Sequence, residues 1–293
     1  MLLFLKPTVN LHLPVTRIDK SVKKCIDTLL KQDLQDWELL LINNSLTNNF
    51  NFCKEYSMKN SRIRVFEQQY SELGKAKNIG IENARGEYIS FIYSEDFIDK
   101  DFYLKLIEAC EKYDADVSCG SIIRTSKGIK TYKLKYANEE VYTNPQEKID
   151  VAHVPDMSYV WNKVYKTEFL KRINLKFIEG MFFEDVDFVT KAVYFSNKIV
   201  TVPDTTFHNL SNCDFSFNEI KSSDKKRADS LKSKEMLIEF FKEHKLKTNI
   251  KNLIKRKTCV TILGLPIITV CEWDDRKKYY LFNCIPLSEI MSE

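Results

Sequence analysis

The chain has 293 residues, of which 44% are hydrophobic and 29% are charged. This composition is that of a globular protein with a full core, and it excludes a chain that is disordered or fibrous throughout. The 45 basic and 41 acidic residues leave a formal charge of only +4, so the composition does not require a nucleic acid partner.

Basic residues are concentrated near the end of the chain, where residues 221–257 hold thirteen lysines and arginines against five acids. Local positive charge of this kind attracts anionic lipid headgroups, and a solvated helical surface is an equal alternative. The eight cysteines include no pair with CxxC spacing, which is typical of reduced thiols in a cytosolic protein. No stretch reaches the roughly 18 apolar residues of a membrane-spanning helix. We therefore expect a cytoplasmic protein, with peripheral membrane contact as one use of the basic segment.

The first 124 residues alternate between two hydrophobic patterns. Short apolar or alternating runs predict strands, and apolar residues three and four positions apart predict helices, with Asp19 as the first N-cap. Strands and helices in this alternation predict βαβ units and a mainly parallel sheet. Ligands of such sheets bind beyond the carboxyl ends of the strands, which here are the loops after Ile42 and Tyr93. The predicted strands are 9–13, 37–42, 63–66, 88–93 and 117–124, and the predicted helices are 19–30, 73–84 and 101–113.

The remaining residues are less regular. Residues 125–160 predict irregular connections or an edge hairpin, and the segment 223–256 predicts a helix because it lacks proline and glycine. The further predicted elements are helices at 161–170 and 185–195, a strand at 198–202, and a terminal hairpin from the similar segments 261–267 and 280–287.

Two adjacent carboxylates follow the strand at 88–93, in Tyr93-Ser94-Glu95-Asp96. Mg²⁺ commonly binds through one or two carboxylates together with substrate phosphates, so this segment predicts a site for a divalent cation and a diphosphate. The alternative is an ordinary turn or helix cap, because a helix follows. The sequence has neither a GxGxxG fingerprint nor a P-loop, so side chains and a cation would have to hold any nucleotide.

A second acidic pair, Glu184-Asp185, follows Met181-Phe182-Phe183 and begins a predicted helix. A carboxyl group against aromatic side chains can have a raised pKa, which suits a general base, and helix capping is the alternative. Trp161-Asn162-Lys163 offers an aromatic face and polar ends to a sugar, whereas a tryptophan in the core is the commoner case.

Several short segments, taken together, carry a family resemblance. They are Pro14-Val15-Thr16-Arg17, Cys25-Ile26-Asp27-Thr28-Leu29-Leu30-Lys31-Gln32, Ile42-Asn43-Asn44-Ser45-Leu46-Thr47-Asn48, Ala76-Lys77-Asn78-Ile79-Gly80, Ala84-Arg85-Gly86-Glu87-Tyr88-Ile89, Tyr93-Ser94-Glu95-Asp96, Trp161-Asn162-Lys163-Val164-Tyr165 and Glu184-Asp185-Val186. By these segments the chain resembles the family-two glycosyltransferases of the GT-A fold, especially bacterial enzymes of surface-polysaccharide assembly, from about Val9 to Leu210. Asn44, Tyr93 and Glu95 stand where that family usually has Asp.

The resemblance implies an α/β fold of the GT-A kind: a Rossmann-like, mainly parallel central sheet with flanking helices. To this we add a small C-terminal helical and β-hairpin appendage. The expected domains are a glycosyltransferase domain over 1–215, with a nucleotide-binding half at 1–124 and an acceptor half at 125–215, and the appendage over 216–293.

The same resemblance implies a reaction and its residues. A sugar would pass, with inversion, from a nucleotide-sugar, first of all a UDP-sugar, to a glycan or lipid-linked acceptor. Asp185 would deprotonate the acceptor hydroxyl with support from Glu184, and Glu95 and Asp96 would hold Mn²⁺ or Mg²⁺. The nucleotide pocket would include Thr16, Asn44, Lys77 and Ser94, and the acceptor or sugar would meet Trp161, Asn162 and Lys163.

Two alternatives remain open at this point. A degenerate family member would bind a sugar or a protein partner without turnover, and the altered Asn44 and Tyr93 positions motivate this reading. A nucleotidyltransferase on a related α/β fold would release pyrophosphate, but the sequence lacks the glycine-rich, basic triphosphate loop that we would expect of it.

Overall fold

A computed structural model describes residues 7–15, 19–44, 50–68, 72–126, 129–210 and 224–247, together with four strands between 256 and 291. The chain divides into two compact units, Met1–Ser233 and Lys234–Glu293. The larger unit contains every segment that the sequence analysis singled out for chemistry.

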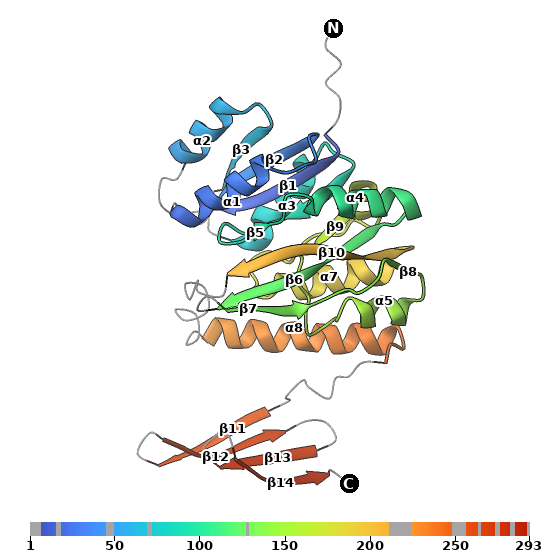
Figure 1. The fold of residues 1–293 in the computed structure, drawn as a ribbon. Helices are drawn as coiled ribbons and strands as arrows, with labels where there is room; N and C mark the ends of the chain where they lie inside the picture. The colour runs from blue at the N-terminus through green and yellow to red at the C-terminus, as the bar shows by residue number, and fades with distance from the viewer. Residues whose placement is uncertain are drawn as a thin grey trace. The chain divides into compact units, whose positions relative to one another are not determined.

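A central mixed sheet forms the core of the larger unit (Figure 1). All seven residues of β1 (Val9–Val15) and of β2 (Trp37–Asn43) are buried, because helices cover both faces of the sheet there. Strand β7 (Ile129–Leu134) extends the sheet by pairing with β6 (Val117–Ser126), and β8 (Glu140–Tyr142) does so by pairing with β10 (Ile199–Leu210). In spatial order the main strands are β3 (Ile63–Glu67), β2 (Trp37–Asn43), β1 (Val9–Val15), β4 (Tyr88–Phe91), β9 (Lys163–Lys166), β6 (Val117–Ser126), β10 (Ile199–Leu210) and β5 (Phe97–Ile98).

The first half of this sheet is parallel and the second half is mostly antiparallel. Strands β3, β2, β1 and β4 run in one direction, whereas β9 is antiparallel to both β4 and β6. From β1 the chain moves outward to β2 and β3, and then returns to place β4 on the other side of β1. Such a reversal of strand order opens a crevice at the carboxyl ends of the two central strands. The predicted acidic segment at 93–96 begins at this edge.

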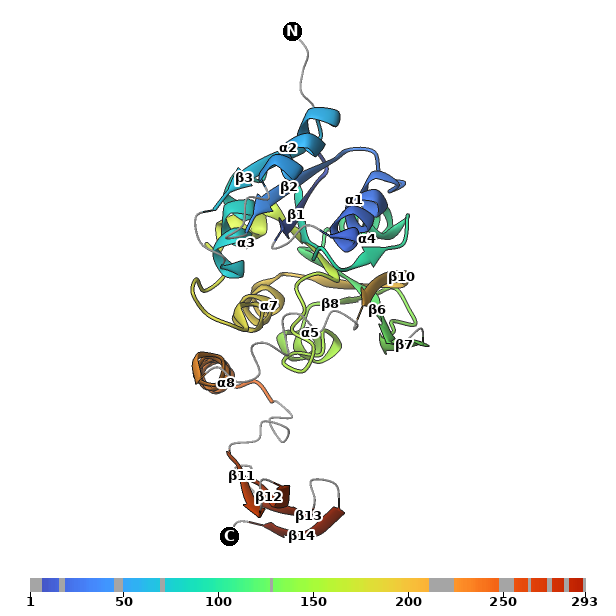
Figure 2. The same ribbon diagram turned by 90° about the vertical axis from the view of Figure 1, so that its left-hand side faces the viewer.

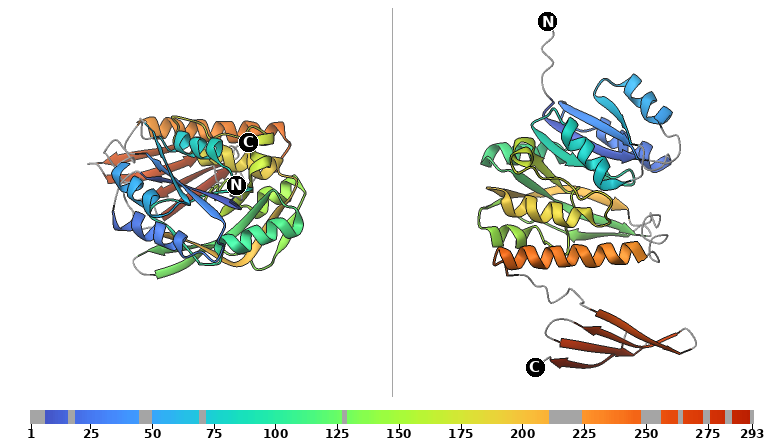
Figure 3. Two further views of the ribbon diagram at one scale, coloured as in Figure 1. Left: turned by 90° about the horizontal axis from the view of Figure 1, so that it is seen from above. Right: turned by 180° about the vertical axis from the view of Figure 1, so that it is seen from behind.

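Helices α1 (Lys20–Leu30) and α4 (Phe102–Tyr113) cover one face of the sheet, and α3 (Leu73–Asn83) and α7 (Glu184–Phe195) cover the other (Figures 2 and 3). The predicted N-cap at Asp19 is confirmed, since its Oδ1 accepts hydrogen bonds from the backbone N–H groups of Ser21 and Val22 at 2.8 and 3.2 Å. The helices of the unit are α1 (Lys20–Leu30), α2 (Phe50–Lys59), α3 (Leu73–Asn83), α4 (Phe102–Tyr113), α5 (Pro145–Val151), α6 (Thr167–Arg172) and α7 (Glu184–Phe195).

The predicted helix at 161–170 is wrong in its first half. Residues 163–166 form β9, and α6 begins only at Thr167. The strand lies between β4 and β6, so its side chains Lys163, Val164 and Tyr165 are all buried. A short run buried on both faces has no period of two, and from sequence it cannot be told from a buried helix. The irregular region at 125–160 contains β7 (Ile129–Leu134), β8 (Glu140–Tyr142) and α5.

A long helix, α8 (Asp224–Glu243), begins in the larger unit and ends in the smaller one. The predicted helix therefore stops before 256, where β11 begins. Where one terminal hairpin was predicted, the smaller unit has a four-stranded antiparallel sheet in the order β11 (Arg256–Ile262), β12 (Leu265–Glu272), β13 (Arg276–Leu281) and β14 (Ile285–Met291). Within the described part of the chain, none of the helices is long and apolar enough to cross a membrane.

Candidate active site

The acidic segment after β4 forms a tight turn that is braced from two sides. The N–H of Asp96 donates to the carbonyl of Tyr93 at 3.1 Å, and the thiol of Cys25 on α1 donates to the same carbonyl at 3.4 Å. Asp96 is only 3% exposed, and its Oδ1 accepts a hydrogen bond from Nδ2 of Asn209 at 3.0 Å. The turn is therefore held in place by one contact from α1 and one from β10.

A second contact with β10 fixes the residues just after the turn. The ring of His208 stacks on Phe97 with centroids 4.5 Å apart, and its Nε2 lies 2.8 Å from Oδ1 of Asp99. Two consecutive residues of β10, His208 and Asn209, thus hold Asp99 and Asp96. Each of these two contacts joins residues that lie more than 100 positions apart in the sequence.

The turn presents a donor set that suits a hard divalent cation. Glu95 and Asp96 are adjacent carboxylates, and Mg²⁺ is commonly held by one or two carboxylates with phosphate oxygens and water as its other ligands. The described residues contain no group of three or more His, Cys, Asp or Glu arranged around a metal position. The turn fits an ion that arrives with a phosphate-bearing substrate, and it does not fit a closed structural site.

The second acidic pair meets a buried lysine from α3. The side chain of Lys77 is fully buried, and its ammonium donates to Oε1 of Glu184 at 2.7 Å, to Oδ1 of Asp185 and to the hydroxyl of Tyr93 at 2.8 Å. The Tyr93 hydroxyl in turn donates to Oδ2 of Asp185 at 3.0 Å. The three donors of the ammonium are all used, and the ring of Phe177 lies 4.8 Å from Nζ.

Burial determines the protonation of this cluster. Burial raises the pKa of Asp185 to about 6, against the opposing charge of Lys77. Burial alone would lower the pKa of Lys77, but Asp185, Tyr93 and Glu184 together outweigh it and raise that pKa well above the usual value. Burial also raises the pKa of Tyr93, so its hydroxyl stays protonated and can donate. At neutral pH Asp185 is ionised with a pKa near the working range of a general base.

Helix α3 docks the segment that leads to the two acids. Asn78 pairs with the backbone of Phe177, accepting from its N–H at 2.8 Å and donating to its carbonyl at 2.9 Å. A Cβ on Gly74 would lie 2.5 Å from the carbonyl oxygen of Ile178, so only glycine allows this approach. The two hydrogen bonds of Asn78 give the motif Ala76-Lys77-Asn78-Ile79-Gly80 a physical role.

The Trp161-Asn162-Lys163 segment lies in the core. The indole of Trp161 stacks on Tyr159 and Phe207, with centroids 4.7 and 4.3 Å apart, and is 5% exposed. Asn162 donates to the carbonyl of Gly120 at 2.8 Å, which ties the start of β9 to β6. Lys163 is fully buried and donates to Oδ1 of Asn162 at 2.8 Å. The predicted contact of these three residues with an acceptor or sugar stays a prediction.

The predicted nucleotide residues fall in three different settings. Asn44 is 1% exposed at the end of β2, where its N–H donates to the carbonyl of Val15 at 2.9 Å. Ser94 is half-buried in the acidic turn, and Lys77 is engaged by the two acids and Tyr93. Thr16 lies outside the described residues.

The structure therefore brings Lys77, Glu184 and Asp185 together. Tyr93, the first residue of the acidic turn, bonds to both Lys77 and Asp185 and so joins this cluster to the turn. The sequence analysis did not predict the bracing role of Asn209 or the bond from Tyr93 to Asp185. For the bond from Tyr93 to Asp185, the available signal was a tyrosine at a position usually held by Asp. The sequence around Asn209 offered no signal of its bracing role.

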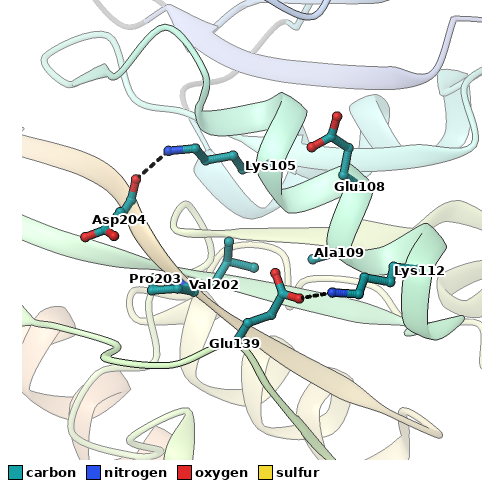
Figure 4. Close-up of a pocket in the computed structure, with 8 residues that line it drawn as sticks. All are labelled: Lys105, Glu108, Ala109, Lys112, Glu139, Val202, Pro203 and Asp204. Carbon is teal, nitrogen blue, oxygen red and sulfur yellow. Dashed lines mark hydrogen bonds and ion pairs between the residues drawn. The ribbon is translucent and has the colours of Figure 1, made fainter.

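A surface pocket of about 360 Å³ lies elsewhere, between α4 and β10 (Figure 4). Both of its lysines have partners: Lys105 donates to the carbonyl of Asp204 at 2.9 Å, and Lys112 to Glu139 at 2.7 Å. None of the predicted site residues lines it, so it does not compete with the acidic turn as the candidate site.

Comparison with known proteins defines the class. Residues 13–173 match the model of the family described as Glycosyl transferase family 2, which is more than half of the chain. The chain therefore belongs to glycosyl transferase family 2. The matched region includes the acidic turn and ends before Glu184 and Asp185.

Individual relatives agree with this assignment. The chain is 32% identical over 193 residues to the uncharacterized glycosyltransferase EpsJ of Bacillus subtilis, which covers 64% of this chain and 56% of EpsJ. It is 26% identical over 203 residues to the glycosyltransferase GlyA of Streptococcus pneumoniae, covering 66% of this chain and 29% of GlyA. The matched part of the chain thus spans less than two thirds of the length of each relative.

Solved structures support the GT-A fold. The S. aureus TarS fragment 1-349 in complex with UDP-GlcNAc aligns with a TM-score of 0.63 at 18% identity, over 85% of this chain and 76% of TarS 1-349. The mannosyltransferase PcManGT of Pyrobaculum calidifontis, in complex with GDP-Man and Mn²⁺, aligns with a TM-score of 0.52 at 13% identity. The alignment covers 70% of this chain and 57% of PcManGT. At such identities the likeness is one of fold.

Proposed function

We propose that this chain is an inverting glycosyltransferase that moves a sugar, of hexosyl type, from a nucleotide-sugar to a hydroxyl of a glycan or lipid-linked acceptor in surface-polysaccharide synthesis. The observation that carries the proposal is the cluster of Lys77, Tyr93 and Asp185 at the start of the acidic turn. It joins a carboxylate of raised pKa, whose side chain is 18% exposed, to a turn with two further carboxylates.

Asp185 is the general base in this proposal. Its carboxylate takes the proton of the acceptor hydroxyl while the acceptor oxygen bonds to the anomeric carbon of the donor sugar. The bond from that carbon to the diphosphate oxygen breaks on the opposite face, so the configuration inverts. A carboxylate has about four lone-pair sites, and Lys77 and Tyr93 use two of those on Asp185. The remaining sites can accept the acceptor's proton.

Lys77 acts through the acids in this proposal and not through the nucleotide. Its ammonium pairs with both Glu184 and Asp185, which offsets the cost of removing the Asp185 carboxylate from most of the surrounding water. The charge of Lys77 lowers the pKa of Asp185, so without this cation Asp185 would be harder to ionise. Glu184 shares the ammonium and so supports Asp185.

Glu95 and Asp96 would hold Mn²⁺ or Mg²⁺ against the donor. The ion, when bound, neutralises the charge that develops on the diphosphate as it leaves. The hydrogen bond from Asn209 fixes the Asp96 carboxylate for this purpose. PcManGT was solved with Mn²⁺, which supports a divalent ion on this fold.

A UDP-sugar is the donor that we propose first. TarS, a structural neighbour, was solved with UDP-GlcNAc and with UDP. Asn44 and Ser94, at the carboxyl ends of β2 and β4, are the described residues that we place in the nucleotide pocket. For the acceptor side we propose Trp161, Asn162 and Lys163 as buried supports of the site, since all three lie in the core around the start of β9.

A lipid-linked acceptor would bring the chain to the cytoplasmic face of a membrane. We propose that the basic segment at 221–257 makes this contact, because it concentrates positive charge in an otherwise balanced chain. Flotation with vesicles containing phosphatidylglycerol measures this membrane contact. We expect binding that is lost at high salt, and an absence of binding would contradict the proposal.

A second candidate, a binding protein without turnover, is favoured by one observation. Each oxygen of Asp185 is engaged by a neighbour, and Tyr93 stands where the family usually has Asp. Such a protein would bind nucleotide-sugar and release no nucleoside diphosphate.

One screen separates the two functions. Thermal shift with nucleoside diphosphates and nucleotide-sugars, with and without Mn²⁺, identifies the bound donor, because a ligand of the native state raises the melting temperature. The same donors are then assayed for release of nucleoside diphosphate. For an enzyme, a donor raises the melting temperature and nucleoside diphosphate is released. For a binding protein, a donor raises the melting temperature and no nucleoside diphosphate is released. Release of pyrophosphate from nucleoside triphosphates would support the nucleotidyltransferase instead.

A further inference from the structure

The residue directly before the two acids has an unfavourable backbone conformation. Phe183 is the N-cap of α7, with φ 63° and ψ 32° in the left-handed region. For a bulky residue this conformation is unfavourable, so neighbouring contacts have to maintain it. A change at Phe183 would alter the direction in which α7 starts, and with it the positions of Glu184 and Asp185.

The first turns of α8 supply these contacts. The carboxylate Oδ2 of Asp229 accepts the backbone N–H of Phe182 at 3.0 Å. Lys225 donates to the carbonyl of Gly180 and lies 3.1 Å from the same Asp229 oxygen, which fixes the orientation of the carboxylate. Nζ of Lys225 also lies 5.4 Å from the ring centroid of Phe182.

A third residue of α8 contacts the strained position itself. Nζ of Lys226 lies 5.8 Å from the ring centroid of Phe183. The hydrogen bond from Phe182 lowers the pKa of Asp229, so this carboxylate is ionised and accepts strongly at neutral pH. The segment 180–183 is thus held by α8 on one side, while Asn78 of α3 holds Phe177 just before it.

We propose that Asp229 is a positioning residue for the base Asp185, and that the first turns of α8 belong to the catalytic machinery. This inference rests on the proposed function, in which Asp185 removes the acceptor proton. The path is short: Asp229 holds the N–H of Phe182, which keeps Phe183 left-handed and so sets the first turn of α7. Residue 229 lies well beyond the family match at 13–173, so the chain completes its active site with a segment outside that match.

Hydrogen exchange tests the positional part of the inference on the full chain. Asp229→Ala removes the acceptor of the Phe182 N–H, so peptides covering 180–187 should exchange about tenfold faster. Glu235→Ala, which removes an exposed acid of the same helix, should leave those peptides unchanged. Unchanged exchange in Asp229→Ala overturns the inference, whether or not sugar transfer is detected.

Kinetics test the functional part. Asp229→Ala should lower kcat about 100-fold, as expected of a catalytic group misplaced by about 1 Å, with the KM of the donor within about twofold. Asp229→Asn keeps one oxygen for the Phe182 N–H and should recover most of the loss. Faster exchange with an unchanged kcat overturns the inference. A wild-type chain that releases no nucleotide from any donor refutes the proposed function, and the exchange result then decides the inference by itself.

Discussion

The ammonium of Lys77 lies 2.7 Å from Oε1 of Glu184, although 107 positions separate the two residues in the sequence. The ion pair joins α3, in the parallel half of the sheet, to the first turn of α7. Because the side chain of Lys77 is fully buried, loss of either partner would leave the other buried without its counter-charge.

Loss of Lys77 should therefore destabilise the protein strongly. Lys77→Met leaves Glu184 and Asp185 without their cation, and breaking a buried pair by removing one partner costs about 3–5 kcal/mol. Urea unfolding at pH 7.5 measures this loss in the free energy of unfolding. Lys176→Met, which removes an ion pair with Glu82 that is half exposed on both sides, should leave the urea midpoint nearly unchanged. Equal effects of the two variants would mean that the Lys77 cluster does not stabilise the fold.

Activity should depend on pH through Asp185. Its pKa is raised to about 6 by burial, so the base is protonated below that pH and ionised above it. We expect kcat/KM to rise tenfold per unit up to about pH 6 and then to level off. The hydrogen bond from Tyr93 favours the ionised form, so Tyr93→Phe should move the rise to higher pH. A rise that moves to lower pH would contradict this geometry.

The same pKa predicts a stability change with pH. The folded-state pKa of Asp185 lies above its usual value of 3.8, so the folded state binds this proton more tightly than the unfolded state does. Its contribution to stability is complete below about pH 4 and is lost as pH rises through about 6. Urea midpoints of wild type and Asp185→Asn, compared between pH 4 and 7, should therefore differ in slope in this window. Parallel curves would refute the raised pKa.

Asn209 should strengthen metal binding without touching the metal. Its amide fixes the Asp96 carboxylate, and loss of such an outer partner typically weakens metal affinity about 10–100-fold. Mn²⁺ titration in the presence of UDP, followed by electron paramagnetic resonance, measures the affinity. Asp96→Asn should abolish the binding, Asn209→Ala should weaken it, and Asn138→Ala, a change at an exposed asparagine, should have no effect. Full affinity in Asp96→Asn would place the metal elsewhere.

The close approach of Gly80 to β1 can be tested by a double-mutant cycle. A Cβ at Gly80 would lie 2.3 Å from Nδ1 of the buried His12, so Gly80→Ala should cost about 1–3 kcal/mol through overpacking. His12→Ala makes room, and the double variant should be more stable than the sum of the two single losses predicts. Additive losses would mean that the backbone moves away and the histidine is not the obstacle.

The parallel half of the fold was predictable because its local signals agree. The apolar runs at 37–42 and 88–93 mark β2 and β4, and Asp19 caps α1 as predicted. The second half was less predictable, because β9 is a short strand buried on both faces and its sequence has no strand period. The helix α2 has a weak apolar face and was not predicted.

The candidate site was predictable residue by residue and not as an arrangement. The acids at 95–96 and 184–185 were chosen by their positions after apolar runs, and Lys77 by its motif. Spacing along the chain cannot reveal that Lys77 reaches Asp185, because sheet topology and not local pattern brings α3 to α7. The partners Asn209 and Asp229 are ordinary polar residues in sequence, and only their contacts with Asp96 and Phe182 distinguish them.

The most direct measurement of the central claim compares two acids on the same turn of α7. Asp185 meets Lys77 and Tyr93, whereas Asp187 pairs with Lys191 at 2.9 Å and takes no part in the cluster. Release of nucleoside diphosphate from the donor identified by thermal shift is measured with Mn²⁺ for wild type, Asp185→Asn and Asp187→Asn. The account predicts a loss of at least about 100-fold in Asp185→Asn and less than about twofold in Asp187→Asn. Undiminished release in Asp185→Asn would contradict the assignment of Asp185 as the base.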